Sequence, residues 1–335
     1  MPLTVGETMI EHRETDKSLI ERVRTACERV AAKATRVQID RHCISSYAAS
    51  LPPERAAHPE HDADSHYLGH GEDTVAFFLT LDAINFGSGY FPHLCKRPGM
   101  SGYFTIASAL KDYYEAHGPL SAQALTRLDM EDCATMFGQD LGRAPIRELM
   151  QLFATALNDL GRYLLDRFDG SFGRLVEAAG SSAGRLVQLL IEMPCFDDVA
   201  LYEGLQVPFY KRAQLTAADL ALAFGGQGAG HFDDLDRLTI FADNLVPHVL
   251  RVDGVLRYAD DLAACIDREE LIPPGCAEEI EIRACAVHAV ELLSEALRRS
   301  GRDVSPIKLD YILWNRGQGP YYKARPRHRT RTVYY

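Results

Sequence analysis

Apolar residues recur at three- and four-residue intervals in several stretches, which is the spacing of amphipathic helices. This spacing predicts helices over residues 19–31, 107–114, 146–165, 183–191 and 280–297. Asp16 precedes the first helix as a candidate N-cap, and Gly301 follows the last as a candidate terminator. Alternating strand patterns are rare, so we expect a mainly α fold.

A polar stretch from Pro52 to Glu72 interrupts this pattern and reads as a loop. Its four histidines fit no zinc-binding spacing, so they favour a polar loop over a metal site; they are His58, His61, His66 and His70. The chain then turns apolar from Thr74 and reaches Asp82 and Asn85. Polar side chains in such a setting need partners.

Composition narrows the functional classes. The 335 residues include 36 Lys and Arg against 47 Asp and Glu, a net charge of −11. This sign disfavours binding to a nucleic acid polymer. No stretch is apolar enough to span a membrane and no signal peptide is evident, so a cytoplasmic location without membrane partners is expected. Eight cysteines without a C-x-x-C motif give no reason to expect a metal, a cofactor or a disulfide framework. Oligomeric state stays open.

Lys211 stands at the start of a predicted helix, directly after Phe209 and Tyr210. A cation in a first helical turn gains nothing from the helix dipole. The ordinary interpretation is a solvated lysine. The aromatic neighbours favour instead a partly buried ammonium group that requires an anion.

Asp243 follows an apolar run and precedes the next helical pattern. By itself it could simply be an N-cap. The order Lys-x-Ala on one helix and Asp opening the next is similar to that of helix-hairpin-helix base-excision glycosylases. A carboxylate near a buried lysine can stabilise an oxocarbenium-like sugar or position a water. Lys211 and Asp243 therefore form a candidate catalytic pair for cleaving an N-glycosidic bond.

Other motifs give weaker signals. Asp197 and Asp198 are more simply structural carboxylates. The glycines between 225 and 230 lack the strand and the Lys-Ser/Thr of a phosphate-binding loop. Trp314, the single tryptophan, is either a core residue or a surface on which a base stacks.

Several segments together resemble the queuosine salvage protein family, from about residue 60 to the end. They are Asp82-Ala83-Ile84-Asn85-Phe86, Phe168-Asp169-Gly170-Ser171-Phe172, Leu201-Tyr202-Glu203-Gly204, Val207-Pro208-Phe209-Tyr210-Lys211-Arg212-Ala213-Gln214, Phe241-Ala242-Asp243, Leu309-Asp310-Tyr311-Ile312-Leu313-Trp314 and Tyr334-Tyr335. The resemblance implies an N-glycosyl hydrolase that converts queuosine 5'-phosphate, a small-molecule nucleotide, into queuine and ribose 5-phosphate. It also implies Lys211 and Asp243 as the catalytic residues.

The same resemblance implies a two-lobed helical fold similar to that of helix-hairpin-helix DNA glycosylases, within a single catalytic unit over residues 1–335. An N-terminal lobe, about 1–140, would supply base-binding residues. A C-terminal lobe, about 141–335, would carry the catalytic pair. Asp82, Asn85 and Phe86 would line the pocket for the 7-deazaguanine base.

Other substrate contacts are less defined. Phe86 or Trp314 could stack on the base. Tyr335 belongs to the C-terminal segment that resembles the family and is a further candidate contact. The phosphate could be bound by any of four cationic or titratable residues, His248, Arg251, Arg329 and Arg331. Two other functions stay open, a DNA glycosylase of the helix-hairpin-helix type and a non-catalytic protein that binds a modified nucleobase.

Overall fold

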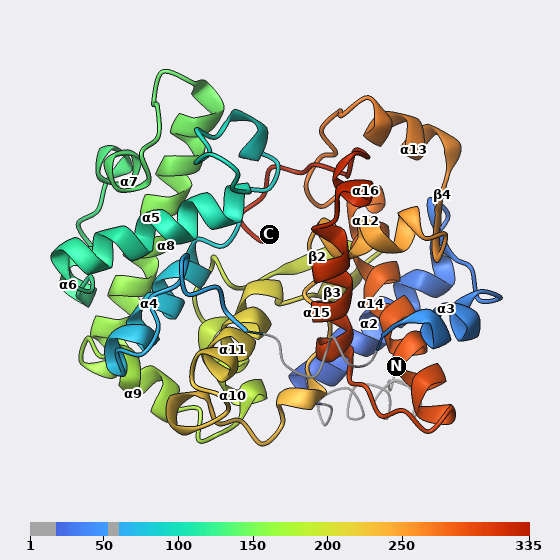
Figure 1. The fold of residues 1–335 in the computed structure, drawn as a ribbon, viewed down its shortest axis with the longest axis horizontal. Coiled ribbons are helices and arrows are strands. Elements are labelled where there is room, and N and C mark those ends of the chain that lie inside the picture. Colours follow the sequence, from blue (N-terminus) through green and yellow to red (C-terminus); the bar gives the residue numbers. More distant parts are fainter. Residues whose placement is uncertain (1–17, 53–59) are drawn as a thin grey trace, which may run out of the picture.

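The computed structural model describes residues 18–52 and 60–335, and helices dominate it (Figure 1). The mainly α prediction is confirmed. The α-helices are α2 (Leu19–Lys33), α3 (Ile44–Ser50), α4 (Glu72–Ala83), α5 (Gly102–His117), α6 (Ala122–Leu125), α7 (Met130–Phe137), α8 (Ala144–Phe168), α9 (Phe172–Glu177), α10 (Ala183–Leu190), α11 (Lys211–Ala223), α12 (Leu245–Val252), α13 (Asp260–Asp267), α14 (Ala277–Arg299), α15 (Pro306–Gly317) and α16 (Pro320–Lys323). Short 3-10 helices are η2 (Phe91–His93), η3 (Gly228–Gly230) and η4 (Leu235–Arg237).

The predicted helices match observed ones closely. Those over 107–114, 146–165, 183–191 and 280–297 correspond to α5, α8, α10 and α14. The first corresponds to α2, whose N-cap is Ser18; its hydroxyl accepts a hydrogen bond from the Glu21 amide at 3.3 Å. The predicted cap, Asp16, lies outside the described residues, as does His58.

The helices pack as two groups on opposite sides of the molecule (Figure 1). In the first group, α8 packs on α4, α6, α7 and α9, and α11 packs on α4 and α10. In the second, α14 packs on α2, α3, α12 and α15. Helix α2 joins the C-terminal helices because its apolar face, including Val23 and Cys27, is buried. The division into lobes near residue 140 stays a prediction.

Two antiparallel strand pairs complete the described structure. Strand β1 (Val37–Ile39) pairs with β4 (Leu256–Tyr258), and β2 (Val199–Tyr202) pairs with β3 (Leu205–Pro208). The second pair matters for the site because β3 ends three residues before Lys211. None of the helices in the described ranges is long and apolar enough to cross a membrane.

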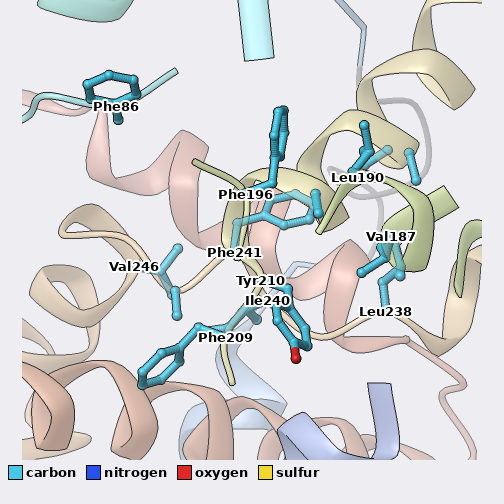
Figure 2. Packing of buried hydrophobic residues seen from close by; sticks show 14 of the residues in the cluster. Phe86, Val187, Leu190, Phe196, Phe209, Tyr210, Leu238, Ile240, Phe241 and Val246 are labelled. Carbon is cyan, nitrogen blue, oxygen red and sulfur yellow. The ribbon is translucent and has the colours of Figure 1, made fainter. Parts of the chain in front are cut away.

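The segments that carry the predicted catalytic pair meet in the hydrophobic core. Figure 2 shows Phe209 and Tyr210 among the same buried side chains as Ile240 and Phe241. The buried Gln214 joins these segments through hydrogen bonds. Its amide group donates to the Phe209 carbonyl at 2.8 Å, and its oxygen accepts from the Thr239 amide at 2.9 Å.

Candidate active site

A buried ion pair fixes the turn that leads into Lys211. The Lys211 backbone amide donates to Asp198 Oδ2 at 3.3 Å. The Asp198 carboxylate also accepts two hydrogen bonds from Arg283, at 3.0 and 2.5 Å. Tyr210, just before the helix, adopts a left-handed conformation with φ of 50°. Asp198 is thus structural, as its sequence context indicated, and it sets where α11 begins.

Arg212, the next residue of α11, connects this helix to the end of α4. Its guanidinium donates to the carbonyls of Asp82, Ala83 and Cys195 and lies between the rings of Phe86 and Phe196, 4.8 Å from each centroid. A cation at a helix C-terminus complements the free carbonyls there. The contact brings Asp82 and Asn85 to the side of Lys211.

The Lys211 ammonium group is buried, with 5% of the residue exposed. Its Nζ donates to the Asn85 carbonyl at 3.4 Å. Burial lowers the pKa of Lys211, and the negative charges of Asp243 and Asp82 oppose that shift. The expectation of a desolvated lysine near an anion is confirmed.

Asp243 lies half-buried at the N-terminus of α12. Its Oδ1 accepts hydrogen bonds from the amides of Leu245 at 2.7 Å and Val246 at 3.3 Å. The carboxylate therefore satisfies free amides at the helix start, although Asn244 occupies the N-cap position. The capping and catalytic interpretations are compatible, because one oxygen orients the group and the other is left for a ligand.

Lys211 and Asp243 both line a pocket of about 590 Å³, within the usual range for small-molecule sites. Both helix groups contribute to its wall. The first supplies residues of α5, α11 and the loop after α4, and the second supplies the start of α12, α15 and the C-terminal segment. This position between the groups makes the pocket the candidate active site.

One side of the pocket is acidic. Asp219 of α11 lies on the pocket wall, and Asp82 is fully buried behind it. Burial raises the pKa of Asp219 to about 7, against the opposing charge of Lys211. Burial and the charge of Asp219 raise the pKa of Asp82 well above its usual range. His61 Nε2 contacts the Asp219 carbonyl at 2.9 Å.

Asp310 of α15 is a further buried carboxyl group on the wall. Its Oδ1 accepts a hydrogen bond from the Phe241 amide at 2.9 Å, which holds the segment before Asp243. Burial, and then the charge of Asp243, raise the pKa of Asp310 well above its usual range.

Basic residues also line the pocket. Besides Lys211, they are Lys96, Lys323, Arg327 and Arg329. The pKa of Lys96 is lowered by partial desolvation and then by the charges of Arg327 and Arg329, which indicates that the three groups cluster. Such a cluster suits an anionic group of a ligand.

Aromatic side chains also line the pocket. Phe86 lines the pocket but is 2% exposed and packs edge-to-face on Phe153, with centroids 5.2 Å apart. Trp314 is half-buried and packs edge-to-face on Phe104. Tyr335 lies under the Arg283 guanidinium, 4.6 Å from its ring centroid. Trp314 is therefore more available to stack on a ligand than Phe86.

The structure does not bring every sequence candidate to this pocket. His248 is buried against the Tyr322 carbonyl at 2.9 Å. Arg251 forms an ion pair with Asp267 at 2.9 Å, and Arg331 packs over Tyr90. None of these three lines the pocket, so Arg329 is the one phosphate candidate from the sequence that does. Charge alone could not distinguish them.

Sequence reasoning also missed residues that line the pocket, above all Asp219. A signal for it existed, because Lys211, Leu215, Asp219 and Leu222 recur at helical spacing and all four line the pocket. Asp310 lies within the same family-resembling segment as Trp314. Lys96 and Arg327 are in loops and gave no periodic signal.

Comparisons with known proteins show the family to which the chain belongs. Residues 65–335 match the family model described as queuosine salvage protein. The chain belongs to the queuosine salvage protein family. A relative from Sphaerobacter thermophilus, named queuosine 5'-phosphate N-glycosylase/hydrolase, is 38% identical over 93% of this chain and 97% of its own. Relatives with the same name from Dictyostelium discoideum and Mus musculus are 34% and 32% identical, covering 79% and 91% of this chain and 79% and 96% of their own.

For this member of the queuosine salvage protein family, the charges define an order across the pocket. The basic cluster interacts with Asp243 through Arg327. Asp243 in turn interacts with Lys211, and Lys211 also interacts with Asp82 and Asp219. A ligand with an anion at one end and hydrogen-bond donors at the other would match this order.

Proposed function

We propose that the protein hydrolyses the N-glycosidic bond of queuosine 5'-phosphate to queuine and ribose 5-phosphate. The order of charges across the pocket supports this most directly, because a nucleotide presents phosphate, sugar and base in the same sequence. The names of the related proteins point to the same substrate. A cytoplasmic location and independence from any nucleic acid polymer form part of the proposal.

In this proposal Asp243 acts on the sugar. The amides of Leu245 and Val246 orient its carboxylate, so its free oxygen can stabilise an oxocarbenium-like transition state and guide a water to the anomeric carbon. Lys211 supports Asp243 electrostatically and can contact the sugar. A 7-deazaguanine base has carbon in place of N7, so protonation at N7 cannot assist its departure. Stabilisation on the sugar side is correspondingly important.

The two ends of the pocket then bind the rest of the nucleotide. Lys96, Arg327 and Arg329 would bind the 5'-phosphate through charge-assisted hydrogen bonds. Asn85 and Asp219 would contact the base at the opposite end, and Trp314 would provide an aromatic surface.

Asp243→Asn and Lys211→Ala are expected to lower turnover of queuosine 5'-phosphate by about 10²–10³-fold or more, since each removes preorganised charge. Chromatographic detection of free queuine measures this directly. Asp166→Asn, an exposed position on α8, is the control for loss of a carboxylate and should keep wild-type turnover. Circular dichroism should show that all three variants fold.

Wild-type turnover by either pocket variant would contradict the assignment of the pair. Retention of intact queuosine 5'-phosphate without any release of queuine would instead indicate a binding protein. Tight, salt-dependent binding of duplex DNA would favour the DNA glycosylase alternative.

A further inference from the structure

One buried oxygen next to the candidate site lacks a partner. Asp82 is fully buried, and its Oδ1 accepts a hydrogen bond from Asn85 Nδ2 at 3.4 Å. Its Oδ2 is completely covered and accepts no hydrogen bond from the described residues. The Thr216 hydroxyl, which interacts with Asp82, donates to the Arg212 carbonyl at 2.9 Å. The adjacent side chain is the carboxyl group of Asp219, which is itself an acceptor when ionised. An unsatisfied buried acceptor is unfavourable, so this arrangement calls for a proton between the two groups.

The charges around the two groups support a retained proton. Lys211 interacts with Asp243, Asp82 and Asp219, whereas Arg212 interacts with Asp82 and Arg327 interacts with Asp243. Lys211 is therefore shared among three carboxyl groups, which leaves the charge of the Asp82 and Asp219 pair incompletely compensated. Buried charge without compensation is costly, so the pair favours one retained proton. Two interacting carboxyl groups of this kind titrate jointly.

The remaining groups around the pair do not replace that proton. These groups are His61 in the loop before α4, Tyr103 of α5 and Tyr311 of α15. His61 Nε2 contacts the Asp219 backbone carbonyl at 2.9 Å and lies 3.9 Å from Asp219 Oδ1, and burial lowers its pKa. A neutral His61 therefore adds no positive charge to the carboxyl pair.

We propose that Asp219, sharing one proton with Asp82 behind it, is the general acid that protonates the departing base. This inference rests on the proposed function. Asp219 lines the pocket and interacts with Lys211, whereas Arg327 of the basic cluster interacts with Asp243. If the basic cluster binds the phosphate, the base is expected beside Asp219. Asp82, which does not line the pocket, is a positioning residue that keeps the proton on the pair.

The bond between the anomeric carbon and the glycosidic nitrogen breaks, and its electron pair stays with the base. Asp219 gives its proton to a nitrogen or the carbonyl oxygen of that base, so that queuine leaves as a neutral molecule. A water adds to the anomeric carbon and loses a proton to Asp243. Solvent returns that proton to the carboxyl pair.

Substrates with different leaving groups test this assignment. Asp219→Asn should lower kcat for queuosine 5'-phosphate by about 10²–10⁴-fold, the usual range for a general acid. With 4-nitrophenyl β-ribofuranoside 5'-phosphate, whose nitrophenolate leaves without a proton, the same variant should lose less than about fivefold. Asp243→Asn should impair both substrates, because it acts on the sugar. Equal losses on both substrates for Asp219→Asn would overturn the proposal.

The pH dependence provides a second readout. Activity that needs the protonated carboxyl pair is lost as pH rises through the pKa of the pair. For queuosine 5'-phosphate, kcat/KM should therefore fall on the alkaline side of its pH profile, with this alkaline limb near neutral pH. The profile of the nitrophenyl substrate should lack this limb. Loss of the Lys211 proton would instead affect both substrates. Asp82→Asn supplies an amide donor that stabilises ionised Asp219, so it should move this limb to lower pH. An unmoved limb would overturn the proposal, even if Asp219→Asn fails to fold.

The outcomes separate this inference from the proposed function. If the wild-type protein releases no queuine, the proposed function fails and the general acid fails with it. The wild-type protein could instead release queuine but show neither the alkaline limb nor the difference between the two substrates. In that case only the proposed role of Asp219 fails.

Discussion

Lys211 and Arg212 are consecutive buried cations with different roles. Arg212 donates to backbone carbonyls and lies between two aromatic rings. Lys211 has one backbone acceptor, at 3.4 Å, and otherwise interacts through charge. An ammonium group with few fixed partners stays available to a ligand, whereas both terminal nitrogens of the guanidinium donate to backbone carbonyls. The resemblance identified the Phe-Tyr-Lys-Arg-Ala-Gln segment as a whole, and the structure separates the roles within it.

Also at the scale of single residues, the basic cluster predicts that the protein prefers the nucleotide to the nucleoside. Arg327→Gln should raise KM for queuosine 5'-phosphate by at least about tenfold, because a hydrogen bond between charged groups contributes roughly 1.5–3 kcal/mol. Turnover of the nucleoside, which lacks the phosphate, should change little. Arg251→Gln is the matched control, since Arg251 pairs with Asp267 outside the pocket. Equal losses on nucleotide and nucleoside would exclude a phosphate contact.

At the scale of elements, helix starts and ends build the site. Helix α11 begins at Lys211, α12 begins two residues after Asp243, and α4 ends one residue after Asp82. Free amides at a helix start orient the Asp243 carboxylate, and free carbonyls at a helix end bind Arg212. The sequence placed the starts of α11 and α12 well, because apolar periodicity resumes there. It gave no sign that the end of α4 would lie beside the start of α11.

The ion pair between Asp198 and Arg283 supports this arrangement and can be tested on its own. Arg283→Met should lower the free energy of unfolding by about 3–5 kcal/mol, because it leaves the Asp198 carboxylate buried without its cation. Combining it with Asp198→Asn should cost less than the sum of the two single changes, as urea denaturation can measure. Additive losses would show that the two residues act independently.

At the scale of the whole molecule, the C-terminal segment joins the two helix groups. Figure 1 shows the C-terminus lying between them. The Gly87 amide donates to the Tyr335 carbonyl at 3.0 Å, and Arg329 and Tyr335 line the pocket. Gly89 allows the closest approach, because a Cβ there would lie 2.3 Å from the Thr330 carbonyl oxygen. The pocket's shape therefore depends on a contact between residues about 240 positions apart.

Gly89→Ala should displace the C-terminal segment and lower kcat/KM for queuosine 5'-phosphate by up to about 10²-fold, since small misplacements of site residues carry large losses. Gly184→Ala is the control, because its nearest neighbour would be a side-chain oxygen of Asp234 at 3.3 Å. Unchanged activity in Gly89→Ala would show that this contact does not shape the site.

The sequence by itself determined the helical class, the positions of the main helices and, through resemblance, the family with its lysine and aspartate. These features are local or follow from the pattern of apolar residues, so they can be predicted without knowing the packing. The suggested relation to helix-hairpin-helix glycosylases stays a prediction.

The tertiary structure decided which charges meet. It placed α2 with the C-terminal helices, excluded His248 and Arg251 from the pocket, and brought Asp219 against Asp82. Burial and proximity across the chain set these relations and the pKa shifts that follow from them. Residue type and spacing along the chain carry little information about burial or about proximity between distant residues.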